Sequence, residues 1–191
     1  QKKYNFQVHY PGSGVGGPCL PINSYQLLNT AKRTGVNLNI VEYGRKINER
    51  MPEHVIELTL DAFKECNESI SGSDILILGI SYKPDVKDIQ LTPGEHVIKK
   101  LKSLGANIHI YDPYFSSSKI FDINTESNLD DVISKVSASI ILTGHKEFKE
   151  INASFFKKMK KPILIDTRAV IEPSSAKQNG LIFRGLGRGQ Q

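Results

Sequence analysis

The stretch ILILGI, residues 75–80, is a continuous run of apolar residues. Such a run is typical of a parallel β-strand buried on both faces, because a half-exposed strand alternates apolar and polar residues. Four further apolar runs follow: NIHIY (107–111), SIILT (139–143), PILID (162–166) and LIFRG (181–185). Helical patterns lie among them at 93–104, 129–136 and 153–159. This repetition predicts an α/β fold, with a right-handed parallel sheet over residues 72–191.

The helix expected at 93–104 carries its own start signal. Thr92, Pro93 and Glu95 form the pattern of a capping box, with threonine at the cap, proline in the first turn and glutamate three residues on. Residues at helical spacing follow, namely Val97, Ile98, Leu101 and Leu104. Gly105 is expected to end the helix.

Residues before 67 have a mostly helical pattern, after an extended segment at 5–10. Asn23 or Ser24 is expected to cap a helix that ends at Gly35. A second helix places four residues on one stripe: Ile40, Gly44, Ile47 and Met51. Pro52 is expected in the first turn of a third helix, whose inward face has Val55, Thr59, Ala62 and Phe63.

The segment NESISGSD, residues 67–74, is small and polar and marks a candidate domain boundary. It divides the chain into two predicted domains. Residues 1–71 form the helical one, and residues 72–191 form the α/β one.

The composition narrows the class of protein. At 191 residues and 39% hydrophobic content the chain can bury a core, and no apolar segment has the length of a signal or a membrane span. Two cysteines, with no ligands at zinc-binding spacing, favour a reducing, cytoplasmic location without a metal site. The net charge is +5, but lysine runs such as KKMKK (157–161) lack interleaved aromatic residues, so neither nucleic acid nor a membrane is expected as a partner. The start at Gln1 suggests a piece of a longer protein.

The stretch PGSGVGGPCLPIN, residues 11–23, contains the G-x-G-x-x-G spacing of dinucleotide-binding turns at Gly12, Gly14 and Gly17. In that fingerprint the third glycine begins a helix, and an acidic residue lies about 20 positions further on. Here Pro18 and Pro21 follow at once, and no acidic residue stands at the required place. The spacing therefore does not predict an NAD site.

The same loop presents one thiol, Cys19, just before a predicted helix. Glycines let the backbone approach a ligand closely, and the positive end of a helix favours a thiolate, which is a nucleophile. The alternative is a buried, inert cysteine in a turn. The prolines on both sides favour the nucleophile, because rigidity holds a reacting atom in place.

These residues resemble the UDP-glucose/GDP-mannose dehydrogenase family. The glycine stretch is similar to its G-V-G-G-H-C-I-P-x-D loop, and INERMP (47–52) is similar to its N-x-x-M-P. LGISYKPDVKDIQLTP (78–93) resembles its L-G-x-x-Y/F-K-x-D-x-x-D-x-R-x-S-P. Four shorter matches follow: IYDPY (110–114), HKEF (145–148), DTR (166–168) and FRGLGRG (183–189).

The resemblance implies an NAD-dependent, two-step oxidation of the C6 alcohol of a nucleotide sugar to a carboxylate. Family members have an N-terminal Rossmann domain for NAD, a helical central domain that dimerises, and a Rossmann-like domain for the UDP-sugar. This chain is similar to the last part of the central domain followed by the whole UDP-sugar-binding domain. A homodimer through the central helices is implied, and the form of the loop favours UDP-N-acetylmannosamine over UDP-glucose.

The resemblance also implies roles for individual residues. Cys19 would add to the intermediate aldehyde as a thiohemiacetal and then carry a thioester. Gly16 would meet the sugar with its backbone, and Tyr82 and Lys83 would contact the nucleotide sugar. Arg168 would reach a neighbouring active site. The alternatives are that Tyr82 is an ordinary core residue and that Lys83 and Arg168 are solvated surface charges.

The sequence departs from the family pattern at several positions. Asn23 replaces an aspartate four residues after the cysteine and cannot act as a base, and Pro18 replaces a histidine. Gln90 stands where the family has an arginine directed at the NAD pyrophosphate, which makes it the candidate cofactor-binding position. Gly144 replaces an aspartate. A second hypothesis is therefore a stand-alone or degenerate nucleotide-sugar-binding module, and a third is an assembly domain.

Overall fold

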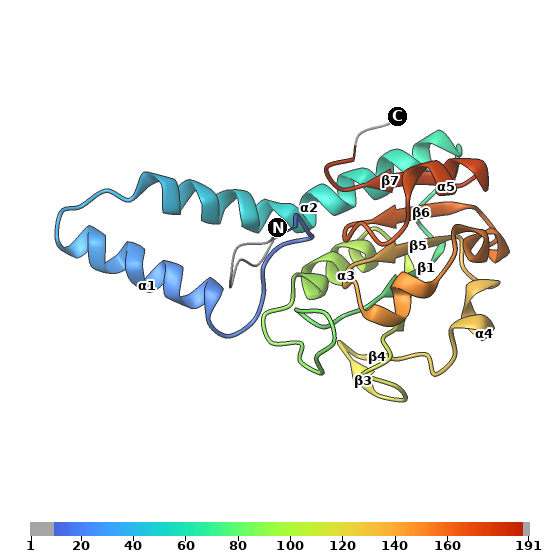
Figure 1. Cartoon of the computed structure of the whole chain (residues 1–191), viewed down its shortest axis with the longest axis horizontal. Helices are drawn as coiled ribbons and strands as arrows, with labels where there is room; N and C mark the ends of the chain where they lie inside the picture. Colours follow the sequence, from blue (N-terminus) through green and yellow to red (C-terminus); the bar gives the residue numbers. More distant parts are fainter. Residues whose placement is uncertain (1–9, 189–191) are drawn as a thin grey trace, which may run out of the picture.

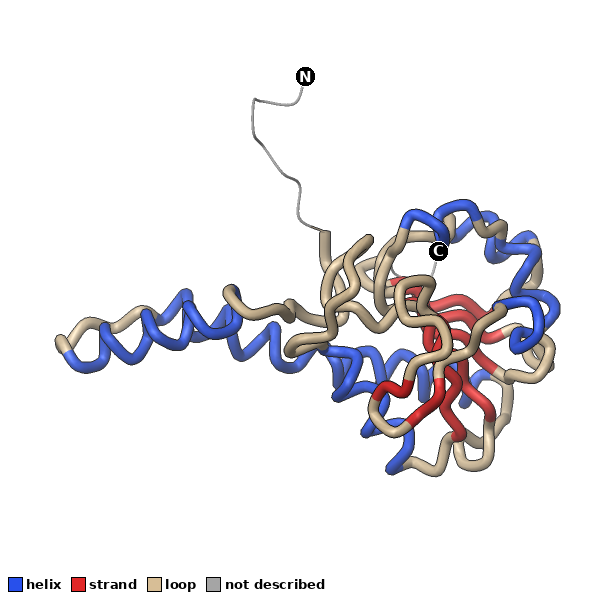
Figure 2. The backbone as a smooth tube through the Cα atoms, turned by 90° about the horizontal axis from the view of Figure 1, so that it is seen from below, coloured by secondary structure: helices blue, strands red, loops and turns tan. Residues whose placement is uncertain are grey.

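The structure is a computed structural model that describes residues 10–188. The segment predicted to be extended at 5–10 lies outside this range, except for Tyr10. The last residue of the FRGLGRG motif, Gly189, also lies outside it. Helix α1 (Leu20–Arg33) and the first half of α2 (Asn39–Glu65) lie side by side and project from an α/β body (Figures 1 and 2). Residues 20–51 are called the helical arm below.

Helix α2 runs without interruption through Pro52, where the sequence predicted that one helix ends and the next begins. That prediction was wrong. An interior proline removes a hydrogen bond and costs about 3 kcal/mol. The residues after it are anchored in the core, since Val55, Ile56 and Phe63 are at most 2% exposed. Burying each such side chain contributes about 1.5–3 kcal/mol, which outweighs the cost of the proline.

Helix α1 begins at Leu20, earlier than the predicted cap at Asn23 or Ser24. The Ser24 hydroxyl donates to the carbonyl groups of Leu20 and Pro21, so it bonds back along the helix and does not cap it. Pro21 lies in the first turn, where its missing N–H leaves no bond unmade. The N-cap position is Cys19, which makes no side-chain cap.

Five parallel strands form the sheet, in the order β2-β1-β5-β6-β7. Their bounds are β1 Asp74–Leu78, β2 Asn107–Tyr111, β5 Ala138–Ile141, β6 Ile163–Asp166 and β7 Ile182–Gly185. In β1, Ile75 pairs with Ile108 on one side and with Ala138 on the other. The sequence predicted all five strands and their parallel arrangement, and the α/β fold is confirmed.

Helices cover both faces of the sheet (Figure 1). The second half of α2 and α3 (Pro93–Ser103) pack on the face that carries Ile75 and Ile77. The other face, with Leu76 and Leu78, packs against α4 (Leu129–Ile133), two 3-10 helices, η1 (Lys146–Glu150) and η2 (Ala153–Lys158), and α5 (Pro173–Gln178). The sequence missed η1, α5 and a small antiparallel hairpin of β3 (Lys119–Ile120) and β4 (Ile123–Asn124), because each is too short for a periodic pattern.

The division into two domains at 71/72 stays a prediction. Within the described residues, the second half of α2 shares its apolar cluster with the sheet, and Arg184 of β7 binds Asp61 and Glu65 of α2.

The arm exposes apolar side chains. The stripe predicted on the second helix includes Ile40 and Ile47, which are 90% and 63% exposed. No helix among residues 10–188 is both long and apolar enough to cross a membrane.

The order in which strands are added to the sheet changes direction between β1 and β5. The next strand, β2, lies on one side of this pair, and β6 and β7 lie on the other. In open α/β sheets, ligands bind in the crevice outside the carboxyl ends of the strands at such a switch point. The residues after β1 and β5 are therefore the place to look for a site.

Candidate functional site

The loop after β1, residues 79–92, carries three of the predicted site residues. Tyr82 is half-buried, whereas Lys83 and Gln90 are exposed. The loop ends at Thr92, whose hydroxyl accepts the N–H of Gly94 and caps α3 as predicted. Glu95 does not complete the capping box, because its carboxylate pairs with Lys99.

The glycine loop, residues 11–19, packs directly on the loop after β1. A Cβ at Gly16 would collide with the carbonyl oxygen of Leu91 and lie 3.0 Å from Cβ of Tyr82. Gly17 has φ +88°, and a Cβ there would lie 2.7 Å from Cε2 of Tyr82. The Gly17 N–H donates to the carbonyl oxygen of Gln90 over 2.9 Å. Both positions therefore require glycine, and the two loops form one junction around Tyr82.

Helix α2 also holds the glycine loop. The N–H of Val15 donates to Oδ1 of Asn48 over 2.9 Å. Asn48 lies four residues before Pro52, which cannot donate to its carbonyl group. Asn48 is the first residue of the N-x-x-M-P motif, yet the sequence analysis gave it no role. Its place in that motif is the signal in the sequence that could have identified it as a site residue.

Cys19 is exposed and forms no disulfide. It lies at the N-cap position of α1, two residues after the junction with Tyr82. The N–H of Asn23 donates to its carbonyl oxygen over 2.8 Å, so residue 23 lies one turn further along the helix. The thiol is accessible, in contrast to the alternative of a buried cysteine.

Arg168 follows β6 and lies against the glycine loop of its own chain. A Cβ at Gly12 would collide with Nη1 of Arg168. Burial lowers the pKa of Arg168, and the carboxylate of Asp166 opposes that shift. Asp166 accepts the N–H groups of Arg168 and Ile171, each over 2.8 Å, and this fixes the turn. Among residues 10–188 the guanidinium has no hydrogen bond or ion pair of its own.

Lys83, next to Tyr82, is exposed, and within the described range its ammonium group has no hydrogen-bond or ion-pair partner. Gln90 contributes its backbone carbonyl, while its side chain is exposed. The structure thus brings together Gly16, Tyr82 and the Gln90 backbone, with Arg168 at Gly12. The roles of all these residues stay predictions.

Small cavities border Arg168, and two of them are formed by described residues. One, of about 10 Å³, has room for a single water and is lined by Ser13, Tyr82, Thr92 and Thr143. The other, of about 240 Å³, lies between the glycine loop and α2 and is lined by Gly12, Val15, Ile47 and Asn48. Ligand pockets usually hold about 300–1,000 Å³. Neither of these two cavities alone has the volume of an ordinary ligand pocket.

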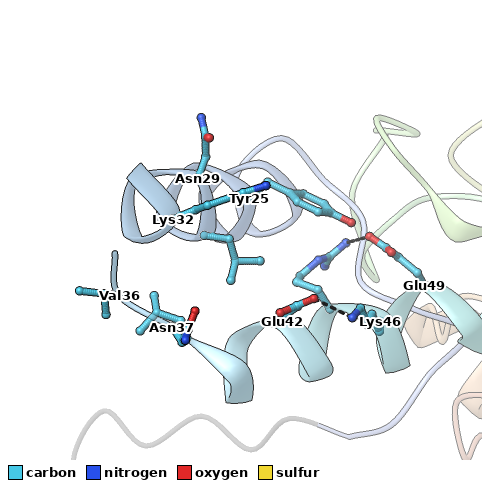
Figure 3. Close-up of a pocket in the computed structure, with 11 residues that line it drawn as sticks. Tyr25, Asn29, Lys32, Val36, Asn37, Glu42, Lys46 and Glu49 are labelled. Carbon is cyan, nitrogen blue, oxygen red and sulfur yellow. Dashed lines mark hydrogen bonds and ion pairs between the residues drawn. The ribbon is translucent and has the colours of Figure 1, made fainter. Parts of the chain in front are cut away.

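A larger cavity, of about 630 Å³, lies between α1 and α2 of the arm (Figure 3). Four of its charged side chains pair with one another, since Arg45 binds Glu49 and Lys46 binds Glu42. The guanidinium of Arg45 also lies 5.2 Å from the ring centre of Tyr25. None of the predicted site residues lines this cavity.

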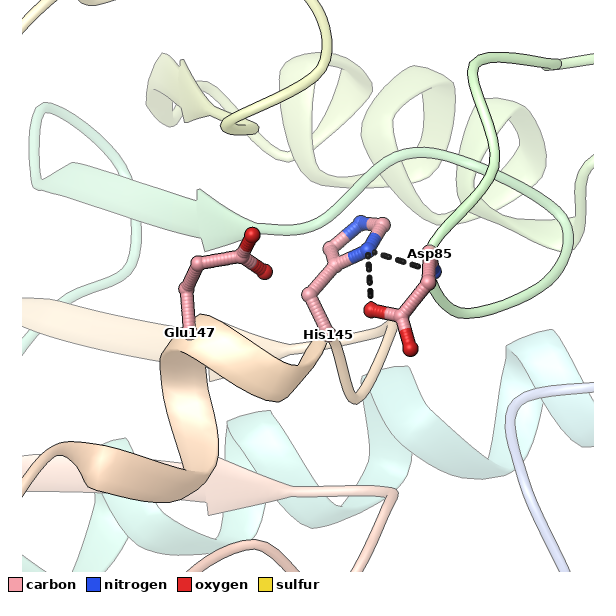
Figure 4. Close-up of side chains that lie close together, drawn as sticks. All are labelled: Asp85, His145 and Glu147. Atoms are coloured by element: carbon pink, nitrogen blue, oxygen red, sulfur yellow. Dashed lines mark hydrogen bonds and ion pairs between the residues drawn. The ribbon is translucent and has the colours of Figure 1, made fainter.

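Asp85, His145 and Glu147 lie close together near the ends of β1 and β5 (Figure 4). Three such side chains can hold a metal ion, but the imidazole already uses both nitrogens. Nδ1 of His145 accepts the N–H of Asp85 over 3.0 Å, and Nε2 donates to Asp112 over 3.1 Å. No lone pair of His145 is left for a cation, so the cluster does not fit a metal.

The described residues do not fit NAD either. Gly17 precedes Pro18 and a helix that begins only at Leu20, so the third glycine does not start a helix as the fingerprint requires. Gln90 supplies no cation for a pyrophosphate.

Known proteins match the chain over both of its parts. Residues 76–173 match the UDP-binding domain of the UDP-glucose/GDP-mannose dehydrogenase family, and residues 1–50 match the central domain of that family. The chain is 35% identical to the UDP-N-acetyl-D-mannosamine dehydrogenase of Pyrococcus horikoshii over 184 residues, which is 96% of this chain and 41% of the relative. It is 30% identical to UDP-glucose 6-dehydrogenase TuaD of Bacillus subtilis over 182 residues, 93% of this chain and 39% of the relative.

Solved structures give the same result. The NDP-N-acetyl-D-galactosaminuronic acid dehydrogenase from Methanosarcina mazei superposes with a TM-score of 0.85 at 31% identity, covering 95% of this chain and 40% of that one. The chain thus spans about two fifths of the length of the relatives it matches.

Proposed function

Because the chain matches the central and UDP-binding domains of the UDP-glucose/GDP-mannose dehydrogenase family and belongs to that family, we propose that it is the C-terminal part of an NAD-dependent nucleotide-sugar 6-dehydrogenase. The observation that carries the proposal is the junction of the glycine loop with Tyr82. The junction lies at the loop after β1, in the part of the chain that matches a UDP-binding domain, and the exposed Cys19 follows it two residues later.

The chemistry assigned to Cys19 is covalent. Its thiolate adds to the aldehyde at C6 of the sugar and forms a thiohemiacetal. Loss of a hydride from that carbon gives a thioester, and water cleaves it to the carboxylate and the free thiol. The hydride acceptor is NAD, bound mainly by a domain beyond this chain, and no residue described above is assigned to that transfer.

Binding of the nucleotide sugar is assigned to the edge where β1 and β6 end. Gly16 approaches the sugar with its backbone, and Tyr82 packs against the ligand from the loop after β1. Lys83 supplies a point charge for a phosphate or the sugar, and Arg168 supplies positive charge to the substrate of a neighbouring active site. Within residues 10–188 the guanidinium of Arg168 has no hydrogen-bond or ion-pair partner, and this supports the assignment, because a half-buried cation is stabilised by an anion.

A UDP-N-acetylhexosamine is the proposed substrate, with UDP-N-acetylmannosamine first and UDP-glucose second. The relatives named for UDP-N-acetyl-D-mannosamine dehydrogenase and for an N-acetylgalactosaminuronic acid dehydrogenase support this order.

A homodimer through the central helices is also proposed. The exposed apolar side chains of the arm, among them Ile40, Tyr43 and Ile47, support it. A cytoplasmic location is part of the same proposal and rests on the two free cysteines.

The test uses the complete protein that carries this chain together with an NAD-binding domain. With UDP-N-acetylmannosamine and NAD, two NADH are expected per sugar, and Cys19→Ser is expected to abolish the second oxidation. Cys66→Ser is the matched control and keeps the activity, because Cys66 lies at the far end of α2. The absence of turnover with every UDP-sugar would contradict the proposal.

The alternative is a nucleotide-sugar-binding module without catalysis. Pro18, Asn23 and Gln90 favour it, since each replaces a residue that the family pattern requires. Under this alternative the 191-residue chain binds UDP in a calorimeter, and no open reading frame for a Rossmann domain precedes Gln1. A Rossmann domain encoded in frame upstream would rule it out.

A further inference from the structure

Asp112, immediately after β2, is a fully buried carboxylate. Its Oδ2 accepts the N–H of Ile80 over 2.8 Å and the N–H and hydroxyl of Ser81 over 3.3 Å each. Its Oδ1 accepts the N–H of Tyr114 over 2.9 Å. Burial opposes the charge, but hydrogen bonds from His145, Ile80 and Tyr114 outweigh burial and lower the pKa of Asp112. The group is therefore an anion that joins the ends of β1 and β2.

His145 extends this network to the end of β5. It is fully buried, and its Nε2 donates to Asp112 while its Nδ1 accepts the N–H of Asp85. The carboxylate of Asp85 accepts the N–H of Lys146 over 3.0 Å. Asp85 is thus bonded twice to the segment after β5, once through its backbone N–H to His145 (Figure 4) and once through its carboxylate to Lys146.

The bonds hold residues 80–85 at both ends. At the start, the Thr143 hydroxyl donates to the carbonyl oxygen of Ser81 over 2.6 Å, in addition to the bonds from Asp112. At the end, Asp85 is held by His145 and Lys146. The residues between these anchors are Tyr82, Lys83 and Pro84, and Tyr82 is the one on which the glycine loop packs. The bonds go mostly to backbone groups, so they fix the path of the chain.

We propose that Asp112 is a positioning residue for nucleotide-sugar binding, which acts through His145 and the backbone of residues 80–85 to hold Tyr82 and Lys83 at the ligand edge. This inference rests on the proposed function and adds to it a residue that does not touch the ligand. A carboxylate is suited to this role because it accepts from several N–H groups at once, and hydrogen bonds to a charged acceptor are stronger than neutral ones.

The experiment compares UDP binding by calorimetry in the 191-residue chain and in Asp112→Asn. The variant keeps the shape of the side chain but loses its negative charge. Its amide NH2 group is a donor and cannot accept the backbone N–H groups that the carboxylate binds. UDP is expected to bind about tenfold more weakly, the scale of one lost charge-assisted hydrogen bond. Amide hydrogen exchange is expected to become faster within residues 80–85 and to stay unchanged in β6 and β7.

Ile163→Val is the control for stability. It removes one methylene from the buried start of β6 and lowers the melting temperature without reaching the loop, so UDP affinity is expected to stay the same. Where Asp112→Asn does not fold, His145→Gln serves instead. It removes the acceptor of the Asp85 N–H, and UDP is expected to bind about threefold more weakly.

The outcomes separate the two proposals. Native-like UDP affinity in Asp112→Asn, or in His145→Gln where it replaces that variant, would overturn the positioning role and leave the proposed function intact. An equal loss of affinity in Ile163→Val would also overturn the positioning role, because the effect would then follow stability alone. A native chain that binds no UDP would overturn the proposed function, and the inference with it.

Discussion

The two halves of α2 belong to one helix but have opposite environments. In the arm, Ile40 and Ile47 are 90% and 63% exposed, whereas in the body Val55 and Phe63 are 0% and 2% exposed. Both halves have apolar residues at helical spacing. Periodicity therefore identifies which face of a helix is apolar, but only the fold determines whether that face is covered. The body covers the second half, and within the described chain the first half stays open.

The largest expected effect tests the covered half. Phe63→Ala is expected to lower the free energy of unfolding by about 3–5 kcal/mol, because it leaves a cavity between α2 and the sheet. Urea denaturation followed by circular dichroism measures the loss. A loss below about 1 kcal/mol would mean that this end of the helix is not part of the core.

The junction between arm and body is the next target. Gly17→Ala is expected to lower the free energy of unfolding by about 1–3 kcal/mol, because Gly17 has φ +88° and faces the Tyr82 ring. Gly35→Ala is the matched control, since Gly35 has φ +74° and nothing within 4 Å of an added Cβ. The difference in urea midpoint between the variants isolates the contact with Tyr82. Equal midpoints would show that this contact adds nothing.

The two cysteines extend the comparison to reactivity. Cys19 is exposed at the start of α1, while Cys66 is partly buried at the end of α2, where burial and then Glu65 and Glu68 raise its pKa. A raised pKa leaves less thiolate at neutral pH, so iodoacetamide is expected to modify Cys19 faster than Cys66 at pH 7.

Mass spectrometry of timed samples measures both rates. The rate at Cys66 is expected to keep rising with pH beyond the ordinary thiol value of 9.0, as its thiolate fraction grows. Faster modification of Cys66 at pH 7 would contradict the exposed position of Cys19.

The smallest effect on folding is expected in the open half of α2. Ile47→Asp is expected to change the free energy of unfolding of the single chain by no more than about 0.5 kcal/mol, because the side chain is 63% exposed. The same variant is expected to remove self-association in analytical ultracentrifugation. A dimer that persists in Ile47→Asp would show that the arm is not the dimer contact.

The sheet could be predicted because its signal is local. The run at 75–80 has no polar residue, and its short length and isoleucine content favour a strand buried on both faces. Thr92 was predictable as a cap for the same reason, since cap and first turn lie within four residues. Pro52 was not, because its cost is outweighed by packing against strands that lie far along the chain.

The same difference between local and long-range signals applies to the candidate site. The glycine loop and Cys19 stand out in the sequence, because six consecutive residues and one thiol carry the signal. The bond between Asp112 and His145 joins positions 33 residues apart, and it becomes visible only when β1, β2 and β5 lie in order. Both residues belong to motifs that the resemblance marked, yet no spacing within the chain says that they touch.

The unbroken course of α2 has a mechanical consequence. A helix of 27 residues spans about 40 Å, and it is far stiffer than two helices joined by a hinge. Asn48, in the first half of α2, accepts a hydrogen bond from the glycine loop, while the C-terminal end of the helix packs against the sheet. A partner that binds the tip of the arm is therefore expected to shift, through Asn48, the loop that leads to Cys19.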